Sequence, residues 1–244
     1  YFCYPSSCFK SATHIQISII KRLKMKKKKI IILCFVFLLF IVAVFFALYS
    51  QREVIIDSAG SFMAPTGDYR ADIAILEGTD FISTGSVEAG IDLLRAGRVK
   101  KILIVVQRIA PAHRPFGIDG DYPNVLGATL LDRGLRQEDF RVIVVPVRSP
   151  ITLKEAEFVI KELAPLKARD AILVAPSFHT RRSYLCYSYF AAPLNIKIYP
   201  LAVFTEHDRE KWWEDKKSRR TFGDESLKLI YYLAAGHIPF KFSY

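Results

Sequence analysis

The sequence predicts an α/β protein with a Rossmann-like, doubly wound, mainly parallel sheet of about five strands, preceded by one transmembrane helix. Three observations support this prediction. Short, continuous aliphatic runs recur along the chain, as in strands that are buried on both faces of a sheet. Segments with a helical period lie between these runs. Residues 30–48 contain no charged side chain, and a helix of that length spans roughly 28 Å, close to the thickness of the hydrocarbon core of a bilayer.

The apolar run at 30–48 is predicted to be an uncleaved, single-pass anchor in a bacterial plasma (inner) membrane. A basic cluster at 21–29 precedes it, so the positive-inside rule places residues 1–29 in the cytoplasm and the following domain outside it. A cleaved signal peptide is the alternative, but the run exceeds the usual apolar region of about 7–15 residues, and residues 47–49 form a poor cleavage site. Met25 directly precedes four lysines, in the order of a bacterial signal anchor, so residues 1–24 are expected to be either a misassigned upstream start or an unusual extension.

The basic excess of the chain belongs mostly to its N-terminus. The formal net charge of +11 comes from 35 basic and 24 acidic residues, and the first 50 residues contain 8 of the basic ones and no acidic one. The remaining chain carries 27 basic against 24 acidic residues, which removes the main reason to propose nucleic acid as a partner. Cys186 is the sole cysteine after residue 50, so we expect the domain to be held by its core without an intrachain disulfide.

The chain after the anchor is predicted to form a stalk at 49–70 and one α/β domain at 71–244. The stalk is mixed in character and contains Gly60, Pro65 and Gly67. A length of about 190 residues suits a single domain with a sizeable core. Five apolar runs are the predicted strands: 72–76, 101–106, 142–147, 171–175 and 196–199.

Helical periods connect the predicted strands. Their apolar positions are Val87, Ile91 and Leu94; Leu126, Leu130 and Leu131; Leu153, Ala156, Val159, Ile160 and Leu163; and residues 184–190, before Pro193. A last helix is expected to pack back on the sheet through Leu227, Ile230, Tyr231 and Ala234, and to stop at Gly236. Because strand and helix alternate, right-handed crossovers should cover both faces of the sheet. Ligands of such sheets bind at the carboxyl ends of the strands, which are followed here by 77–86, 107–122, 148–152 and 176–182.

The segment APSFHTRRS at 175–183 is the most informative of these strand ends. His179 and Arg182 are three residues apart and would project from one face of a first helical turn, beside N–H groups that favour an anion. Ser177 and Arg181 belong to the same candidate site for a phosphate or carboxylate. His179 is also a candidate general acid or base. The alternative is that His179 caps or packs locally and that both arginines are solvated.

The loop after the first predicted strand offers Glu77, Gly78 and Thr79 as ligand-binding candidates. Gly78 would permit a tight turn or the close approach of a ligand. Glu77 and Asp80 are more readily solvated loop carboxylates, because no metal-binding spacing accompanies them. The sequence therefore predicts no metal site.

Two more strand ends contribute candidates. Gln107 and Arg108 begin a connection that is long beside the usual length of about 2–6 residues. Thr152 and Glu155 fit a capping box, which is the favoured role, although such a helix start can cap and bind at once. Cys186 would share a helical face with His179, but a small core residue is favoured over a Cys–His pair.

The chain resembles the YdcF/SanA/ElyC family of bacterial envelope proteins over roughly residues 71–236. The matching segments are ADIAILEG, VEAGIDLLRAGRVKKILIV, ATLLDRGL, TLKEA and SFHTRR. The resemblance implies a Rossmann-like fold and a role in peptidoglycan or surface-polysaccharide assembly. It also implies that Gly78, Thr152, His179 and Arg182 take the places of the family's turn glycine, threonine and His-x-x-Arg. This chain departs from the family at three places. It has Val-Gln-Arg at 106–108 where the family has Ser-Gly-Gly, and Glu155 where the family's Thr-x-x-Asn-Ala has asparagine. It has Ala-Pro at 175–176 where the family has Thr-Ser.

These features predict a membrane-anchored domain that binds a phosphorylated or nucleotide-like metabolite, such as an envelope precursor. His179 is the catalytic candidate. The ligand-binding candidates are Glu77, Gly78, Thr79, Gln107, Arg108, Thr152, Ser177, Arg181 and Arg182. No cofactor or protein partner is identified, and an extracytoplasmic position argues against free ATP and NAD. The alternative function is a non-catalytic envelope scaffold or interaction protein.

Overall fold

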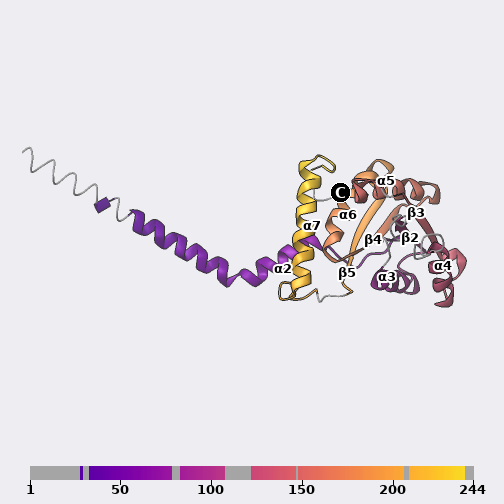
Figure 1. Cartoon of the computed structure of the whole chain (residues 1–244), viewed down its shortest axis with the longest axis horizontal. Helices are drawn as coiled ribbons and strands as arrows, with labels where there is room; N and C mark the ends of the chain where they lie inside the picture. The colour runs from indigo at the N-terminus through magenta and orange to yellow at the C-terminus, as the bar shows by residue number, and fades with distance from the viewer. Residues whose placement is uncertain are drawn as a thin grey trace, which may run out of the picture. The chain divides into compact units, whose positions relative to one another are not determined.

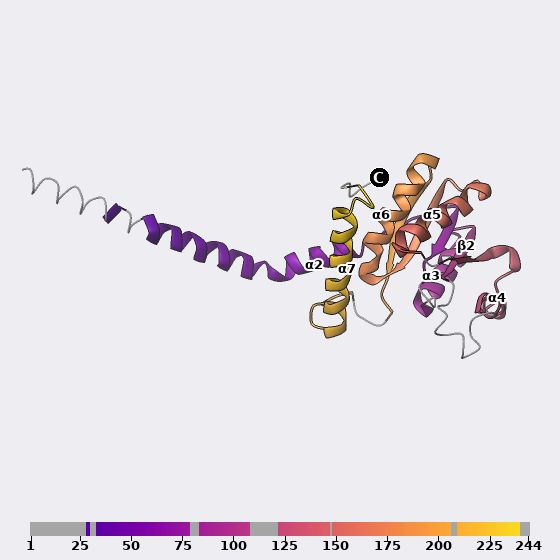
Figure 2. The same ribbon diagram turned by 45° about the horizontal axis from the view of Figure 1, so that its top comes forward.

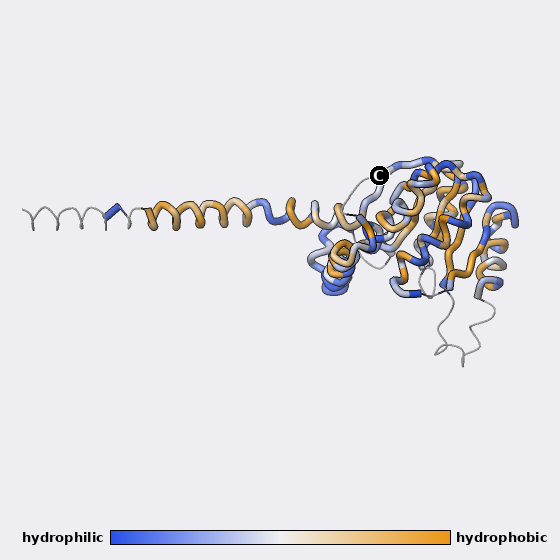
Figure 3. The backbone as a smooth tube through the Cα atoms, turned by 90° about the horizontal axis from the view of Figure 1, so that it is seen from above, coloured by the Kyte–Doolittle hydropathy of each residue, from blue (hydrophilic) through white to orange (hydrophobic). Residues whose placement is uncertain are grey.

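The computed structural model describes residues 28–29, 33–78, 83–107, 122–146, 148–205 and 209–239, and the chain divides into two units. The first unit, Tyr1–Ile55, contains the helix Leu33–Ser50, which is hydrophobic along its length (Figure 3). Its large apolar side chains are exposed. By length and composition this helix could cross a membrane. Over its described part, the predicted anchor therefore coincides with one exposed apolar helix.

The second unit, Ile56–Tyr244, is built on a five-stranded, all-parallel sheet with the order β3-β2-β1-β4-β5 (Figure 1). Its strands are β1 (Ile73–Leu76), β2 (Lys101–Gln107), β3 (Phe140–Val145), β4 (Asp170–Pro176) and β5 (Lys197–Val203). This sheet confirms the predicted α/β, Rossmann-like class. The strand boundaries agree with the prediction to within two residues, except that β5 continues beyond Tyr199.

Helices cover both faces of the sheet (Figure 2). On one face lie α3 (Thr84–Arg95) and α4 (Tyr122–Asp132), and on the other lie α5 (Ile151–Leu163) and α6 (Thr180–Ala191). The helix α2 (Arg52–Met63) precedes the sheet and α7 (Lys216–Ala234) follows it. Four short 3-10 helices complete the described elements: η2 (Gln137–Asp139), η3 (Ala164–Leu166), η4 (Ser177–His179) and η5 (Ala192–Leu194).

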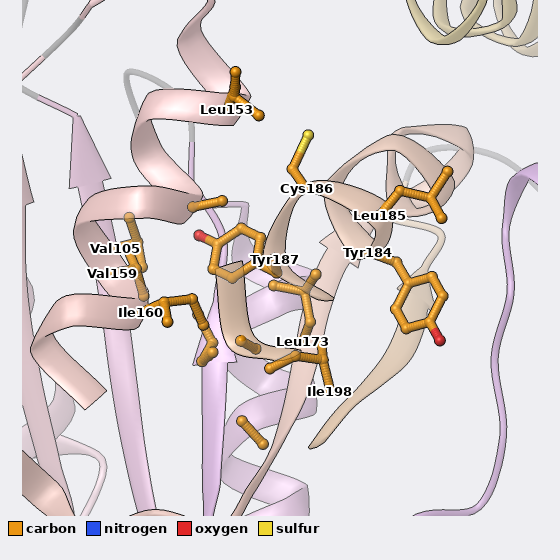
Figure 4. Packing of buried hydrophobic residues seen from close by; sticks show 14 of the residues in the cluster. Val105, Leu153, Val159, Ile160, Leu173, Tyr184, Leu185, Cys186, Tyr187 and Ile198 are labelled. Carbon is orange, nitrogen blue, oxygen red and sulfur yellow. The ribbon is translucent and has the colours of Figure 1, made fainter. Parts of the chain in front are cut away.

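The strands are apolar throughout because both of their faces are buried. In β1, Ile73 and Ile75 belong to the core cluster that contains α5 and α6 side chains, whereas Ala74 and Leu76 belong to the cluster that contains α3 side chains. Figure 4 shows the first of these cores, where side chains of two helices meet those of the strands. Alternate residues of one strand thus hold two helical layers on the sheet.

Part of the predicted stalk is helical and belongs to the folded unit. This unit begins at Ile56, and Met63 and Ala64 are buried in its core. The chain then follows the edge of the sheet, where the N–H of Ala202 in β5 donates to the carbonyl oxygen of Pro65 at 3.2 Å. The folded unit therefore begins before residue 71.

The face on which α7 packs differs from the prediction. Leu227, Ile230 and Tyr231 are 68%, 61% and 58% exposed, while Leu229 and Tyr232 are buried. The main contacts of the helix are with α6 and η4, because α5 and α6 already cover that face of the sheet. The expectation that the stripe containing Leu227 packs back on the sheet is therefore wrong.

Candidate functional site

The strand order fixes where a ligand site can form. β1 and β4 are neighbours, and the helices that follow them, α3 and α6, lie on opposite faces, which leaves a crevice at their carboxyl ends. A cavity of about 650 Å³ lies there. Its lining comes from the strand ends, the start of α5, η4, α6 and α7: Glu77, Gly78, Gln107, Ser149, Pro150, Ile151, Thr152, Pro176, Ser177, His179, Arg182, Thr221, Glu225, Lys228, Tyr231 and Tyr232.

An aromatic cluster holds the turn that carries His179. Phe178, its neighbour in η4, is 1% exposed. It packs edge-on against Phe204, Trp212 and Phe222, with ring centroids 5.5, 5.1 and 5.3 Å away. Burial of this phenyl ring in the core fixes the backbone of η4, and the next side chain, His179, lines the cavity.

His179 stands between two carboxylates. Its Nδ1 lies 3.1 Å from Glu225 Oε2, and its Nε2 lies 3.4 Å from Glu77 Oε1. Arg182 Nη2 also lies 2.8 Å from Nδ1, a contact that is a hydrogen bond only with the neutral ring, whereas both carboxylates favour the cation. Burial alone would lower the pKa of His179, but the charge of Glu77 and hydrogen bonds to Glu225 and Glu77 raise it to about 9. The two carboxylates therefore favour the imidazolium form of His179 at neutral pH.

Arg182 is a buried cation that joins α6 to α5 and α7. Its Nε and Nη2 donate to Glu225 Oε2 at 3.1 and 2.7 Å, and its Nη1 donates to Thr152 Oγ1 at 2.5 Å. Lys228 Nζ donates to the second oxygen, Glu225 Oε1, at 2.7 Å. Burial alone would raise the pKa of Glu225, but its bonds to His179, Arg182 and Lys228 hold the pKa far below its ordinary value. Glu225 is thus ionised and fixes α7 at the cavity.

Two more carboxyl groups are buried at this end of the sheet. Glu77 Oε1 accepts a hydrogen bond from Ser183 Oγ at 2.8 Å. Glu155 accepts hydrogen bonds from Gln107 Nε2 at 2.7 Å and from the Tyr187 hydroxyl at 3.1 Å. Figure 4 shows the Tyr187 ring in the core between α6 and α5. Side chains of β2, α5 and α6 therefore hold these carboxyl groups together.

Most of the predicted site residues that the structure describes meet at the cavity. Those that line it are Glu77, Gly78, Gln107, Thr152, Ser177, His179 and Arg182. Arg181 is directed elsewhere: its Nε donates to the carbonyl oxygen of Phe62 at 2.6 Å, and its guanidinium lies over the Phe62 ring. Thr79, Asp80 and Arg108 lie outside the described residues. Ligand binding by any of these residues stays a prediction.

The predicted capping box is wrong. The N-cap of α5 is Pro150, and no side chain caps this helix. Thr152 lies one residue inside the helix, where its hydroxyl meets Arg182, and Glu155 points to Gln107 and Tyr187. The helix begins earlier than the motif implies, so both side chains face α6 and the strand ends.

Burial decides between the interpretations of three further residues. Glu77, expected as a solvated loop carboxylate, is 4% exposed, and Arg182 is 5% exposed, so the solvated alternative fails for both. Cys186 lies in the core at 0% exposure. Burial raises the pKa of its thiol well above the ordinary value, which makes it an inert core residue, as the favoured interpretation held.

The contribution of α7 was missed. Glu225 and Lys228 are three residues apart, a spacing that is common on solvated helix faces and carries no sign of a site. His179 precedes Glu225 by 46 positions, so only the folded chain shows that they meet. Glu155 was missed as a buried acid because its motif indicated a cap.

The cavity can attract an anion. His179, Arg182 and Lys228 are cationic and Glu77 and Glu225 anionic, which leaves one positive charge in excess among the lining side chains. The first turn of α5, whose N–H groups lack intrahelical partners, also reaches the cavity. Among the described residues, no group of three or more His, Cys, Asp or Glu side chains is arranged to hold a metal ion.

Comparison with known proteins adds no relative to this geometry. No family model matches the chain, and neither a curated protein nor a solved structure matches it.

Proposed function

We propose that this protein is a membrane-anchored, extracytoplasmic domain that acts in cell-envelope biogenesis and binds a phosphorylated or nucleotide-like metabolite. The apolar helix Leu33–Ser50 and the basic cluster before it support the anchor and its orientation. The resemblance to the YdcF/SanA/ElyC family supports a role in peptidoglycan or surface-polysaccharide assembly. The cavity at the ends of β1 and β4 supports the binding of a ligand.

The observation that carries the proposal is the buried ionic network that lines this cavity. The side chains of His179, Arg182 and Glu225 are only 15%, 6% and 8% exposed. Buried charges are costly to desolvate, and a packed apolar core would be at least as stable. Groups with strongly shifted pKa values that gather in a cleft are typical of functional sites. The network therefore supports a site more than it supports stability.

The composition of the cavity wall supports a phosphorylated ligand with a ring. Lys228, with 55% of its side chain exposed, is a cation within reach of a ligand in solution. Tyr231 and Tyr232 line the same side of the cavity from α7, and aromatic rings stack on bases and sugars. A nucleoside diphosphate or a sugar phosphate would satisfy both features.

Binding is tested by titrating the full chain in detergent with uridine diphosphate and with inorganic phosphate in a calorimeter. The critical variant is Lys228→Gln, and the matched control is Lys216→Gln, at the exposed start of the same helix. A charge-assisted hydrogen bond contributes about 1.5–3 kcal/mol, so we expect Lys228→Gln to weaken binding roughly tenfold or more. No binding by the wild type, or equal affinities for the two variants, would contradict the proposal.

The envelope role is tested by complementation. In a strain that lacks this protein, we expect wild-type chain to restore envelope function and the variants His179→Ala and Arg182→Ala to fail. The membrane content of each variant must match that of the wild type, since Arg182 also holds α5, α6 and α7 together. Full complementation by both variants would refute a role for the cavity.

A second candidate function is a non-catalytic scaffold, favoured by the exposed apolar face of α7. Leu227, Ile230 and Tyr231 lie on consecutive turns of this helix and are all more than half exposed. Exposed apolar patches commonly mark sites of interaction with other proteins. The double variant Leu227→Ser/Ile230→Ser tests this function by complementation, with Val125→Ser/Leu131→Ser on the exposed side of α4 as its control. If only the α7 variant loses envelope function while still binding uridine diphosphate, the scaffold function gains support; complementation by both refutes it.

A further inference from the structure

Three carboxyl groups are buried at the cavity end of the sheet against two buried cations. Glu77, Glu155 and Glu225 are 4%, 2% and 6% exposed. His179 and Arg182 are the buried cations that face them. Lys228, a third and more exposed cation, pairs with Glu225. Among the described residues, the ion pairs of these three cations are with Glu77 and Glu225, so an ionised Glu155 would be a buried charge without a cation in contact, which is strongly unfavourable.

The hydrogen bonds identify the carboxyl group that is neutral. Glu225 is bound by the charged groups of Arg182 and Lys228, so it is ionised. Glu155 is bound only by neutral donors, the Gln107 amide and the Tyr187 hydroxyl, among the described residues. This difference makes Glu155 the weaker candidate for a negative charge.

Glu77 has an oxygen that needs a donor. Its Oε1 accepts from Ser183 and faces His179, but its buried Oε2 has no hydrogen-bond donor among the described side chains and backbone. Ser183 and Tyr187 are one helical turn apart on α6 and bind Glu77 and Glu155 respectively, and the two carboxyl groups lie within hydrogen-bond reach of each other. A proton on one of them would supply the missing donor.

We propose that Glu155 carries a proton in the resting protein and donates it to Glu77, so that this pair holds a single negative charge, directed at His179. The surrounding groups agree with this assignment. From α6 come Arg182, Cys186 and Tyr187, from α7 come Glu225, Lys228 and Tyr232, from η4 comes His179, and from β2 comes Gln107. None of the cations among them forms an ion pair with Glu155 in the described part of the chain.

The directions of the pKa shifts are consistent with the proposal. Burial, and then the negative charge of Glu77, raise the pKa of Glu155 above its ordinary value. Burial alone would also raise the pKa of Glu77, but the charge of His179 and the hydrogen bonds from His179 and Ser183 lower it. The proton of the pair therefore belongs on Glu155.

Glu155 is on this account a positioning residue for the site in the proposed function. Because Glu155 is protonated, it donates a hydrogen bond to Glu77 and adds no charge of its own. Glu77 then remains the anion that keeps His179 positively charged. The inference describes the charge state of the protein without a ligand. A negative result on the proton of Glu155 would therefore not refute ligand binding, and a negative result on ligand binding would not refute the proton on Glu155.

The first test is the ionisation of Glu155 at neutral pH, measured by NMR on full chain with ¹³C-labelled glutamate side chains in detergent. The signals of Glu155 and Glu77 are assigned with Glu155→Gln and Glu77→Gln. We expect the carboxyl carbon of Glu155 to have the chemical shift of a protonated carboxyl group at pH 7, and that of Glu77 the shift of an ionised one. An ionised carboxyl signal for Glu155 at pH 7 would overturn the proposal.

The second test needs no variant of the pair to fold. Infrared spectra of the wild-type chain at neutral pH, with isotopically labelled glutamate, should contain the C=O stretch of a protonated carboxyl group. Absence of this band would overturn the proposal. The band should vanish in Glu155→Gln and persist in the control Glu157→Gln, whose carboxylate on the same helix is paired with Lys154 and Lys161.

Discussion

His179 binds its proton more tightly in the folded protein than in the unfolded chain, so its charge is linked to stability. Its pKa rises from an ordinary value of 6.5 to about 9. A raised folded-state pKa stabilises the protein fully below the unfolded value, and this stabilisation is lost as the pH rises through the folded value. We expect wild-type chain to lose up to about 3 kcal/mol relative to His179→Gln between pH 6.5 and 9.

Urea denaturation in mild detergent measures this loss. Trp212 reports unfolding through its fluorescence, because it is 7% exposed and stacks with Phe222 at a centroid distance of 4.3 Å. The difference in free energy of unfolding between wild type and His179→Gln isolates the histidine from other groups that titrate at high pH. A difference that does not change with pH would show that folding does not raise the pKa of His179.

Arg182 should be far more important for stability than an exposed arginine on α7. Its removal leaves Glu225 buried with fewer donors and removes the bond from Arg182 to the Thr152 hydroxyl. Breaking a buried ion pair costs about 3–5 kcal/mol, so we expect Arg182→Ala to lower the free energy of unfolding by that amount. The control Arg220→Ala removes a side chain that is 84% exposed and should change it by less than about 0.5 kcal/mol. Equal losses would show that the buried network adds nothing to stability.

At the scale of elements, the strands were predictable and the far side of the site was not. The residues at 101–106 form a continuous apolar run, which is typical of a strand buried between two helical layers in an α/β protein. This run alone therefore predicts β2. The helix α7 has apolar residues on two faces, and periodicity cannot choose between Leu229 and Leu227. The choice is made by η4 and α6, which accept Leu229, Tyr232 and Glu225, and these partners lie far away in sequence.

The fit of α3 on the sheet yields a prediction at the same scale. A Cβ on Gly90 would come within 2.8 Å of the methyl carbons of Leu76, which is fully buried. We expect Gly90→Ala to destabilise the protein by about 1–3 kcal/mol, since the helix must move or Leu76 must leave its rotamer. Gly223→Ala in α7 is the control, because nothing lies within 4 Å of its Cβ position. There the better helix propensity of alanine should stabilise the protein by up to about 1 kcal/mol, and urea denaturation measures both changes.

At the scale of the whole molecule, charge is distributed unequally between the two units. The first 50 residues carry 8 basic and no acidic side chains. Lysine and arginine beside an apolar span resist translocation, whereas the nearly balanced charge of the remaining chain does not oppose it.

The folded unit uses no disulfide among its described cysteines, since Cys186 is free and buried. Its stability should therefore be the same under reducing and oxidising conditions.

If the helix Leu33–Ser50 anchors the chain in a membrane, this distribution of charge predicts the orientation of the chain, which two reporters fused after Tyr244 can measure. Alkaline phosphatase folds into an active enzyme only outside the cytoplasm, and a fluorescent protein of the common green type matures only inside it. With the basic N-terminus held in the cytoplasm, we expect the phosphatase fusion to be active and the fluorescent fusion to be dark. Replacing the lysines at 26–29 by glutamate removes half of the basic residues before the helix Leu33–Ser50, and it should lower phosphatase activity as part of the population inverts. A bright fluorescent fusion with the native lysines would place the cavity in the cytoplasm, where soluble nucleotides are its natural ligands, and would refute the extracytoplasmic assignment.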